Sequence, residues 1–244
     1  MAATADAFAA LASLEGVASA FAAARDGIDA LLRDRGLRRT GPDLTAEALL
    51  RGARASAALE RGGPAGDEYD ETGAVRLSTA LLGLLPIWRT APLQALARMH
   101  TLVARGTVRD DDLGRPVRSA ARLSDLADRL AAPTSAPGLV VAAVVHAEIA
   151  ASEAFDQHNR VLARAAERLV LAERGVDSAS VTVPEAGHLA LAPAYAHLLE
   201  QYRGAGPEQG PRATHAWLLH CAQAYAVGAE RSPLADPGSA RRTR

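Results

Sequence analysis

An uninterrupted apolar segment in the middle of the chain, residues 139–145, constrains the fold most strongly. It ends at His146 and Glu148, far short of the roughly 20 apolar residues that a membrane span requires. Its β-branched valines are compatible with a buried strand, but apolar and small residues continue at helical spacing as far as Glu153. The segment therefore favours a buried core helix, with a strand as the alternative.

Helical periodicity recurs along the rest of the chain, and the composition agrees with it. Of the 244 residues, 49% are hydrophobic, many of them Ala, while aromatic residues make up only 4%. Because Ala favours helix and has little side-chain volume, we expect closely packed helices with Leu and Val filling the interfaces. A chain of this size can bury one sizeable core. We predict an all-α fold.

Glycine and proline clusters divide the pattern into segments. We expect an N-terminal helical extension over residues 1–44, a main helical domain over 45–230 and a disordered tail over 231–244. The helices expected after the extension cover residues 45–60, 75–88, 92–105, 123–130, 140–149, 159–174, 194–202 and 214–229.

Charge and cysteine content exclude several functions. The formal net charge of −1 creates no global field that would attract nucleic acid or an anionic membrane, so we expect neither as a partner. The Arg-rich end, residues 241–244, is a local exception. All 27 basic residues are Arg, which excludes lysine chemistry such as a Walker A site or a Schiff base. The single cysteine, Cys221, rules out an intrachain disulfide and is expected to be buried. Without a secretory signal pattern, we expect a cytoplasmic protein.

The stretch from Glu153 to Arg164 contains the most specific pattern of the sequence. It reads Glu-Ala-Phe-Asp-Gln-His-Asn-Arg-Val-Leu-Ala-Arg and resembles the motif H-P-F-x-D-G-N-G-R-x-x-R of the Fic (Fido) family of nucleotidyl transferases. Phe155, Asn159 and Arg164 match the motif. The departures affect working groups of the family: Glu153 replaces the catalytic His, Gln157 the metal-binding acid, His158 and Arg160 two glycines, and Val161 the first Arg.

In the Fic family this loop opens a helix whose N-terminus holds nucleotide phosphates. The resemblance implies that Asn159 and Arg164 bind ATP or another nucleotide. Arg160, which replaces a glycine, is expected to contact phosphate through its side chain instead, and Asn159 is expected to be the helix N-cap. A carboxylate in place of the family's general base would repel a triphosphate, and Gln157 is a poorer Mg²⁺ ligand than an acid. We therefore assign no catalytic residue: Glu153, Gln157 and His158 occupy degenerate catalytic positions, and the candidate cofactor is ATP or another nucleotide.

A second resemblance lies on the helix expected to begin near residue 45. Ser56-Ala-Ala-Leu-Glu60 resembles the inhibitory motif S/T-x-x-x-E-G/N of some Fic proteins, with Arg61 in place of the final Gly or Asn. In those proteins the glutamate pairs with the second motif arginine and blocks productive placement of the γ-phosphate. The resemblance implies that Glu60 reaches Arg164.

Weaker matches in the family's order extend the resemblance over about residues 45–230. Leu96 to His100 is similar to the family's Leu/His helix, the segment 114–118 to its G-x-x-R loop, and Tyr195 to Trp217 to its C-terminal helices. The chain offers little or no room after Arg118 for the family's β-hairpin flap, on which target segments add as a strand. The expected architecture is thus a Fic-like helical bundle with an added N-terminal helix.

Three functions remain open at this point. The first is a degenerate Fic-like binding or regulatory module without AMP transfer, acting on an unidentified protein partner. The second is a divergent nucleotidyl or phosphoryl transferase restrained by Glu60. The third is an oxidoreductase, for which the chain offers no intact dinucleotide fingerprint.

We predict no metal site, since His215 and His220 diverge on a helix. His146 is expected to be a core histidine hydrogen-bonded to backbone. Exposed Val or Leu on the N-terminal helix would allow a homodimer, which the sequence leaves open.

Overall fold

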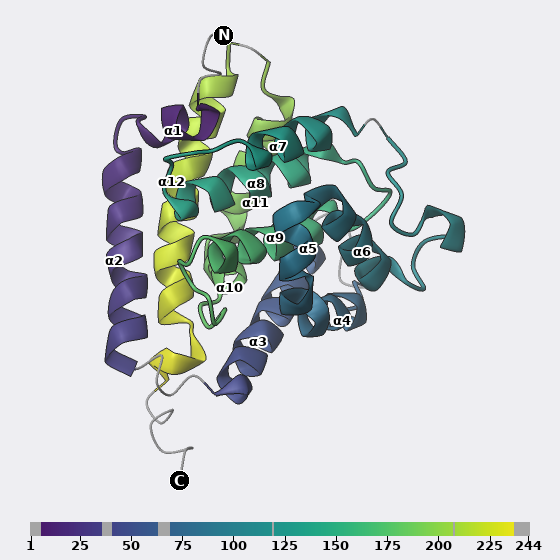
Figure 1. Cartoon of the computed structure of the whole chain (residues 1–244), viewed down its shortest axis with the longest axis horizontal. Coiled ribbons are helices and arrows are strands. Elements are labelled where there is room, and N and C mark those ends of the chain that lie inside the picture. The colour runs from purple at the N-terminus through teal and green to yellow at the C-terminus, as the bar shows by residue number, and fades with distance from the viewer. Residues whose placement is uncertain (1–5, 36–40, 63–68, 119, 207, 237–244) are drawn as a thin grey trace.

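The computed structural model describes residues 6–35, 41–62, 69–118, 120–206 and 208–236. Every regular element within these ranges is helical, and the one β-type pairing there is an isolated bridge between Arg105 and Val108. The all-α prediction is confirmed. The elements, drawn in Figure 1, are α1 (Ala7–Ala12), α2 (Val17–Arg35), α3 (Pro42–Arg61), α4 (Thr72–Ala80), η1 (Leu81–Leu84), α5 (Leu85–Thr90), α6 (Pro92–Ala104), η2 (Asp110–Asp112), α7 (Ala121–Ala131), α8 (Gly138–Ser152), α9 (Asn159–Glu173), α10 (Pro184–Ala190), α11 (Ala192–Gly204), α12 (Gly210–Glu230) and η3 (Pro233–Ala235).

The apolar central segment forms α8, so the helical prediction is correct and the strand alternative is not. Every residue from Leu139 to Ala150 is buried. The helix packs against α9 along most of its length and also touches α7, α11 and α12. Trp217 on α12 donates its indole N–H to the carbonyl oxygen of Ala143 at 2.8 Å, which joins α12 to the middle of α8. A helix covered on all sides can be apolar on all sides.

The N-terminal extension is part of the main core. Helix α2 runs alongside α12 at one side of the molecule (Figure 1) and buries Val17, Phe21, Ala24 and Ile28. Its apolar stripe is therefore used within the chain. Helical spacing makes such a stripe but does not tell which element covers it, so a homodimer through other surfaces stays a prediction.

Several boundaries differ from the prediction. Helix α3 begins at Pro42 in its first turn, and the single helix expected over 75–88 is divided into α4, η1 and α5. Helix α10 was not predicted, because seven residues are too few to show periodicity. The packed chain continues beyond residue 230, since η3 buries Leu234, so the tail expected from 231 onward is wrong for residues 231–236. The Arg-rich end lies outside the described residues.

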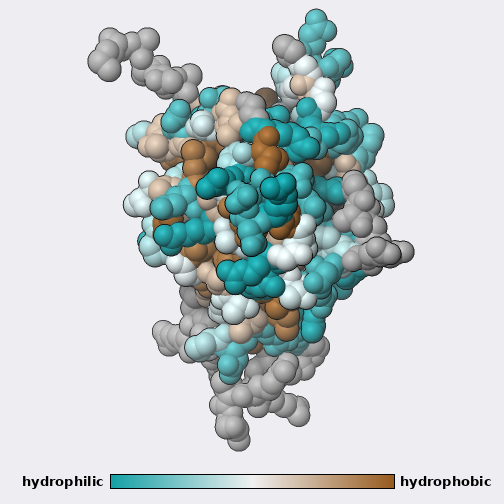
Figure 2. Space-filling model, turned by 90° about the vertical axis from the view of Figure 1, so that its right-hand side faces the viewer, coloured by the Kyte–Doolittle hydropathy of each residue, from teal (hydrophilic) through white to brown (hydrophobic). Residues whose placement is uncertain are grey.

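The surface offers scattered apolar side chains. In the part of the chain that the structure describes, the large hydrophobic residues exposed at the surface are Leu50, Leu93, Val117 and Leu219, which lie on four separate segments. The face shown in Figure 2 is mostly hydrophilic, with small hydrophobic spots between. Isolated exposed apolar residues are ordinary on protein surfaces. No described helix combines the length and hydropathy needed to cross a membrane.

Candidate functional site

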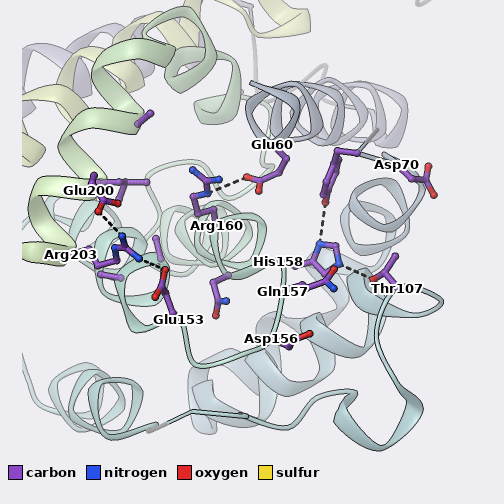
Figure 3. Close-up of a pocket in the computed structure, with 16 residues that line it drawn as sticks. Glu60, Asp70, Thr107, Glu153, Asp156, Gln157, His158, Arg160, Glu200 and Arg203 are labelled. Atoms are coloured by element: carbon purple, nitrogen blue, oxygen red, sulfur yellow. Dashed lines mark hydrogen bonds and ion pairs between the residues drawn. The ribbon is translucent and has the colours of Figure 1, made fainter. Parts of the chain in front are cut away.

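A cavity of about 630 Å³ opens where the C-terminal end of α3, the loop between α8 and α9, and α11 meet (Figure 3). Five of its described lining residues carry carboxylates and two carry guanidinium groups. The carboxylates belong to Glu60, Asp70, Glu153, Asp156 and Glu200, and the guanidinium groups to Arg160 and Arg203. This excess of negative charge opposes a free polyphosphate, because like charges repel over these short distances.

The loop between α8 and α9 is fixed by Asn159. Its side-chain oxygen accepts from the backbone N–H of Phe155 at 3.0 Å, and its side-chain nitrogen donates to the carbonyl oxygen of the same residue at 2.7 Å. Asn159 is the first residue of α9, and the N-cap position belongs to His158, so the predicted cap is displaced by one residue. Glu153 and His158 both have left-handed backbones, with φ of 44° and 67°. Residues other than glycine rarely adopt this backbone conformation, and His158 adopts it at a position where the Fic motif has glycine.

Glu153, at the position that resembles the Fic histidine, faces a cation at the cavity wall. Its carboxylate lies 2.6 Å from the guanidinium of Arg203, which also pairs with Glu200 at 2.5 Å. The backbone oxygen of Glu153 accepts from Arg118. The Glu153 side chain is 48% exposed, so its carboxylate is a solvated ion-pair partner. Gln157 lines the same cavity and is exposed.

His158 is held on both sides of its ring. Nδ1 is hydrogen-bonded to the Tyr69 hydroxyl at 3.3 Å and Nε2 to the Thr107 hydroxyl at 2.9 Å (Figure 3). Burial lowers the pKa of His158, although Glu60 partly opposes this. The ring is therefore neutral at pH 7, since an unperturbed histidine has a pKa near 6.5. A neutral imidazole on the wall of the cavity can accept a proton, provided that one hydroxyl partner gives way.

The predicted pair of Glu60 and Arg164 is present, and it is buried. A carboxylate oxygen of Glu60 lies 2.7 Å from Nη2 of Arg164 and 3.7 Å from Nε of Arg160. Ser56 accepts from Arg164 through its hydroxyl at 2.8 Å and its carbonyl oxygen at 3.3 Å, and the Tyr195 hydroxyl accepts at 2.8 Å. The Arg164 side chain is 1% exposed, so a ligand in the cavity reaches it only if Glu60 moves.

The charges around this pair reinforce each other. Burial opposes the charge of Arg164, but its interactions with Tyr195 and Glu60 outweigh burial and raise the pKa of Arg164. Burial raises the pKa of Tyr195 to about 12, and burial together with Glu60 raises that of Tyr69 to about 12. Both phenols are therefore neutral hydrogen-bonding groups at pH 7, and Glu60 supplies the direct anionic contact to the Arg164 guanidinium.

Comparison with known proteins bears on the fold. No protein-family model matches this sequence, and no curated protein does. Among solved structures, the crystal structure of a Fic family protein from Desulfovibrio desulfuricans G20 at 2.70 Å resolution matches with a TM-score of 0.67 and 18% sequence identity, over 90% of this chain and 74% of that one. This chain has a Fic-like fold. The match covers more of the chain than the motif-bearing segment 45–230, so the Fic-like fold includes part of the remainder.

A second group of polar residues lies in the core of the Fic-like fold, outside the cavity. His146, Glu167 and His188 are each 0% exposed and come from α8, α9 and α10. His146 is hydrogen-bonded to the Tyr195 hydroxyl at 3.0 Å, so the expected backbone partner was wrong. The prediction that His215 and His220 diverge is confirmed, because His215 contacts Glu15 at the surface whereas His220 contacts His188 at 3.1 Å.

Sequence spacing missed this group because its members lie on three different helices, one of them unpredicted. A pattern search tests residues four or so apart on one helix. One chemical feature could have indicated the group. Glu167 lies in the helix after the motif, which packs against the apolar α8, and a carboxylate buried there requires polar partners.

Proposed function

We propose that this chain is a Fic-like binding or regulatory module that does not transfer AMP. The observation that carries the proposal is the position of Glu153. Where Fic enzymes carry the histidine that accepts a proton, this chain has a carboxylate paired with Arg203 in an acidic cavity. Gln157 replaces the metal-binding acid, and the described residues form no flap strand on which a target segment could add.

The cavity still has one feature suited to an anion. Helix α9 begins at its wall, and the first N–H groups of a helix, together with the helix dipole, favour phosphate. Arg160 adds a guanidinium at the same place. The carboxylate of Glu60 lies close to the guanidinium groups of both Arg160 and Arg164. It therefore neutralises the positive charge that a bound phosphate would need. We infer that nucleotide binding requires displacement of Glu60.

Titration of Mg-ATP by calorimetry into the wild-type protein and into Glu60→Ala tests this proposal. Glu200→Gln, which removes another cavity carboxylate without touching Arg164, is the matched control. Binding that appears in Glu60→Ala but not in the control supports a nucleotide pocket closed by Glu60. Absence of binding in all three folded proteins would refute a nucleotide-binding role. Incubation with labelled ATP should leave every variant and candidate target unlabelled.

A divergent nucleotidyl or phosphoryl transferase is the second candidate, favoured by one observation. Ser56 and Glu60 engage Arg164 as the inhibitory motif implies, and a restraint has a purpose only where there is an activity to restrain. Transfer of label in Glu60→Ala that disappears when His158→Gln or Glu153→Gln is added would establish this candidate and refute the first. The cavity residues give no support to the oxidoreductase alternative, which would require a flavin or nicotinamide absorbance band in the purified protein.

A further inference from the structure

The buried histidine cluster, defined as His146, Glu167 and His188, has the composition of a metal site. It combines two imidazoles and one carboxylate, and one potential ligand atom from each residue lies within 4.8 Å of the other two. The three side chains converge from α8, α9 and α10, and none is exposed to solvent. Two histidines and one carboxylate form a common ligand set for catalytic zinc and for non-haem iron.

The distances within the cluster suit a shared ion. His146 Nδ1 lies 3.1 Å from one oxygen of Glu167, and His188 Nε2 lies 3.2 Å from the other. With metal–ligand distances of about 2.0–2.2 Å, ligands at tetrahedral angles lie roughly 3.3–3.6 Å apart. Small side-chain shifts would therefore admit an ion between these atoms.

The orientation of His146 gives an independent indication. Its Nδ1 is fully buried, and although it lies close to Glu167 it makes no hydrogen bond of acceptable geometry. Buried polar groups nearly always have a hydrogen-bond partner, so a buried ring nitrogen that lacks a well-aligned partner requires an explanation. This geometry is expected if the lone pair of Nδ1 points beside the carboxylate, toward the place where an ion would contact all three residues.

The second nitrogen of each ring has a partner that can fix its tautomer. His146 Nε2 lies 3.0 Å from the Tyr195 hydroxyl, and His188 Nδ1 lies 3.1 Å from Nε2 of His220. With protons on these two nitrogens, the lone pairs of His146 Nδ1 and His188 Nε2 both face the carboxylate. Metal-binding histidines characteristically donate their other N–H in this way. The Tyr225 hydroxyl donates to Glu167 at 2.7 Å and orients the carboxylate.

The electrostatic balance also permits a cation. The nearby guanidinium groups are already paired, Arg164 with Glu60 and Arg168 with Glu185, each at 2.7 Å. The cluster combines two imidazoles with one carboxylate, and the carboxylate of Glu167 supplies the acidic group that balances part of the charge of a divalent ion.

We propose that the buried histidine cluster binds one divalent transition-metal ion through His146 Nδ1, His188 Nε2 and an oxygen of Glu167. The ion joins α8, α9 and α10 and acts as a structural element of the core. Because all three ligands are buried, the ion enters as the chain folds. The competing arrangement is a hydrogen-bonded network in which the histidine N–H groups and Tyr225 satisfy Glu167 without metal.

Refolding in the presence of Co²⁺ or Zn²⁺ tests the proposal on the full chain. Protein is unfolded in guanidinium with a chelator, refolded with either ion and dialysed extensively, and bound metal is then measured by mass spectrometry. We expect about one ion per chain, d–d absorption bands of nitrogen-coordinated Co²⁺, and a higher thermal midpoint than in protein refolded without metal. Metal in protein purified from cells without added chelator provides a second measurement that does not depend on refolding.

Two variants identify the site. Glu167→Gln preserves shape but removes the charge, and should weaken metal binding by more than the roughly 10–100-fold that loss of an outer partner costs. His215→Gln removes a histidine outside the cluster and should bind as the wild type does. Folded wild-type protein that retains no metal by either route would overturn the proposal, and so would equal retention by wild type and Glu167→Gln. If Glu167→Gln does not fold, the wild-type Co²⁺ spectrum decides: loss of its d–d bands in His188→Gln supports the site, and their persistence refutes it.

Discussion

Removal of Glu60 should destabilise the protein strongly, because no other anion contacts Arg164 among the residues that the structure describes. The Arg164 and Glu60 side chains are 1% and 8% exposed. In Glu60→Ala the guanidinium keeps only the neutral acceptors Ser56 and Tyr195. Breaking a buried ion pair by deleting one partner costs about 3–5 kcal/mol. For a chain of this length, that loss lowers the thermal midpoint by roughly 6–20 °C.

Guanidinium denaturation followed by tryptophan fluorescence measures this loss, since Trp217 is fully buried. The control is Glu153→Ala, which breaks a pair whose side chains are 41% and 48% exposed and should cost at most about 1 kcal/mol. A double variant, Glu60→Leu with Arg164→Met, removes both charges and should recover most of the loss. If Glu60→Ala and Glu153→Ala cost the same small amount, the argument that burial gives the pair its importance is refuted.

Three further predictions concern the core. Because burial lowers the pKa of His146 to about 4 and that of His220 to about 3, the unfolded histidines, with pKa near 6.5, bind protons first as the pH falls. The free energy of unfolding should therefore be highest above pH 6.5 and decline toward pH 4 in a denaturation series, and a flat profile would contradict the burial of these rings. Gly187→Ala would place a methyl group 1.9 Å from a carbonyl oxygen of α12 and should lower the free energy of unfolding by about 1–3 kcal/mol or more. A methyl group at Gly27 would meet no described atom within 4 Å, so Gly27→Ala should stabilise α2 by about 0.5–1 kcal/mol. Equal effects of these two alanines in urea denaturation would argue against the close approach of α10 and α12. Tyr195→Phe removes the hydroxyl that links α9 to the histidine cluster and should lower the free energy of unfolding by about 1–3 kcal/mol. Denaturation curves equal to those of the wild type would contradict this contribution.

Much of the fold was predictable because it depends on local properties. Alanine content, apolar spacing and the positions of glycine and proline determine which segments are helical, and these are short-range effects. The motif between Glu153 and Arg164 indicated the Fic-like fold, since the loop and the helix that follows it lie within one stretch of sequence. The pair of Glu60 and Arg164 was also predicted, through the resemblance of two separate motifs to the Fic family.

The remaining features depend on which helices meet, and no local pattern states that. The stripe on α2 required a partner, but only the tertiary structure shows that α12 covers it. The cluster of His146, Glu167 and His188 joins three helices, and the ion pair of Glu153 with Arg203 links residues 50 positions apart. The sequence alone predicted most of the helices and the resemblance of the segment from Glu153 to Arg164 to the Fic motif. Tertiary packing decided the charge of the cavity, the burial of Arg164 and the convergence of the histidines, because each depends on distances between segments far apart in the chain.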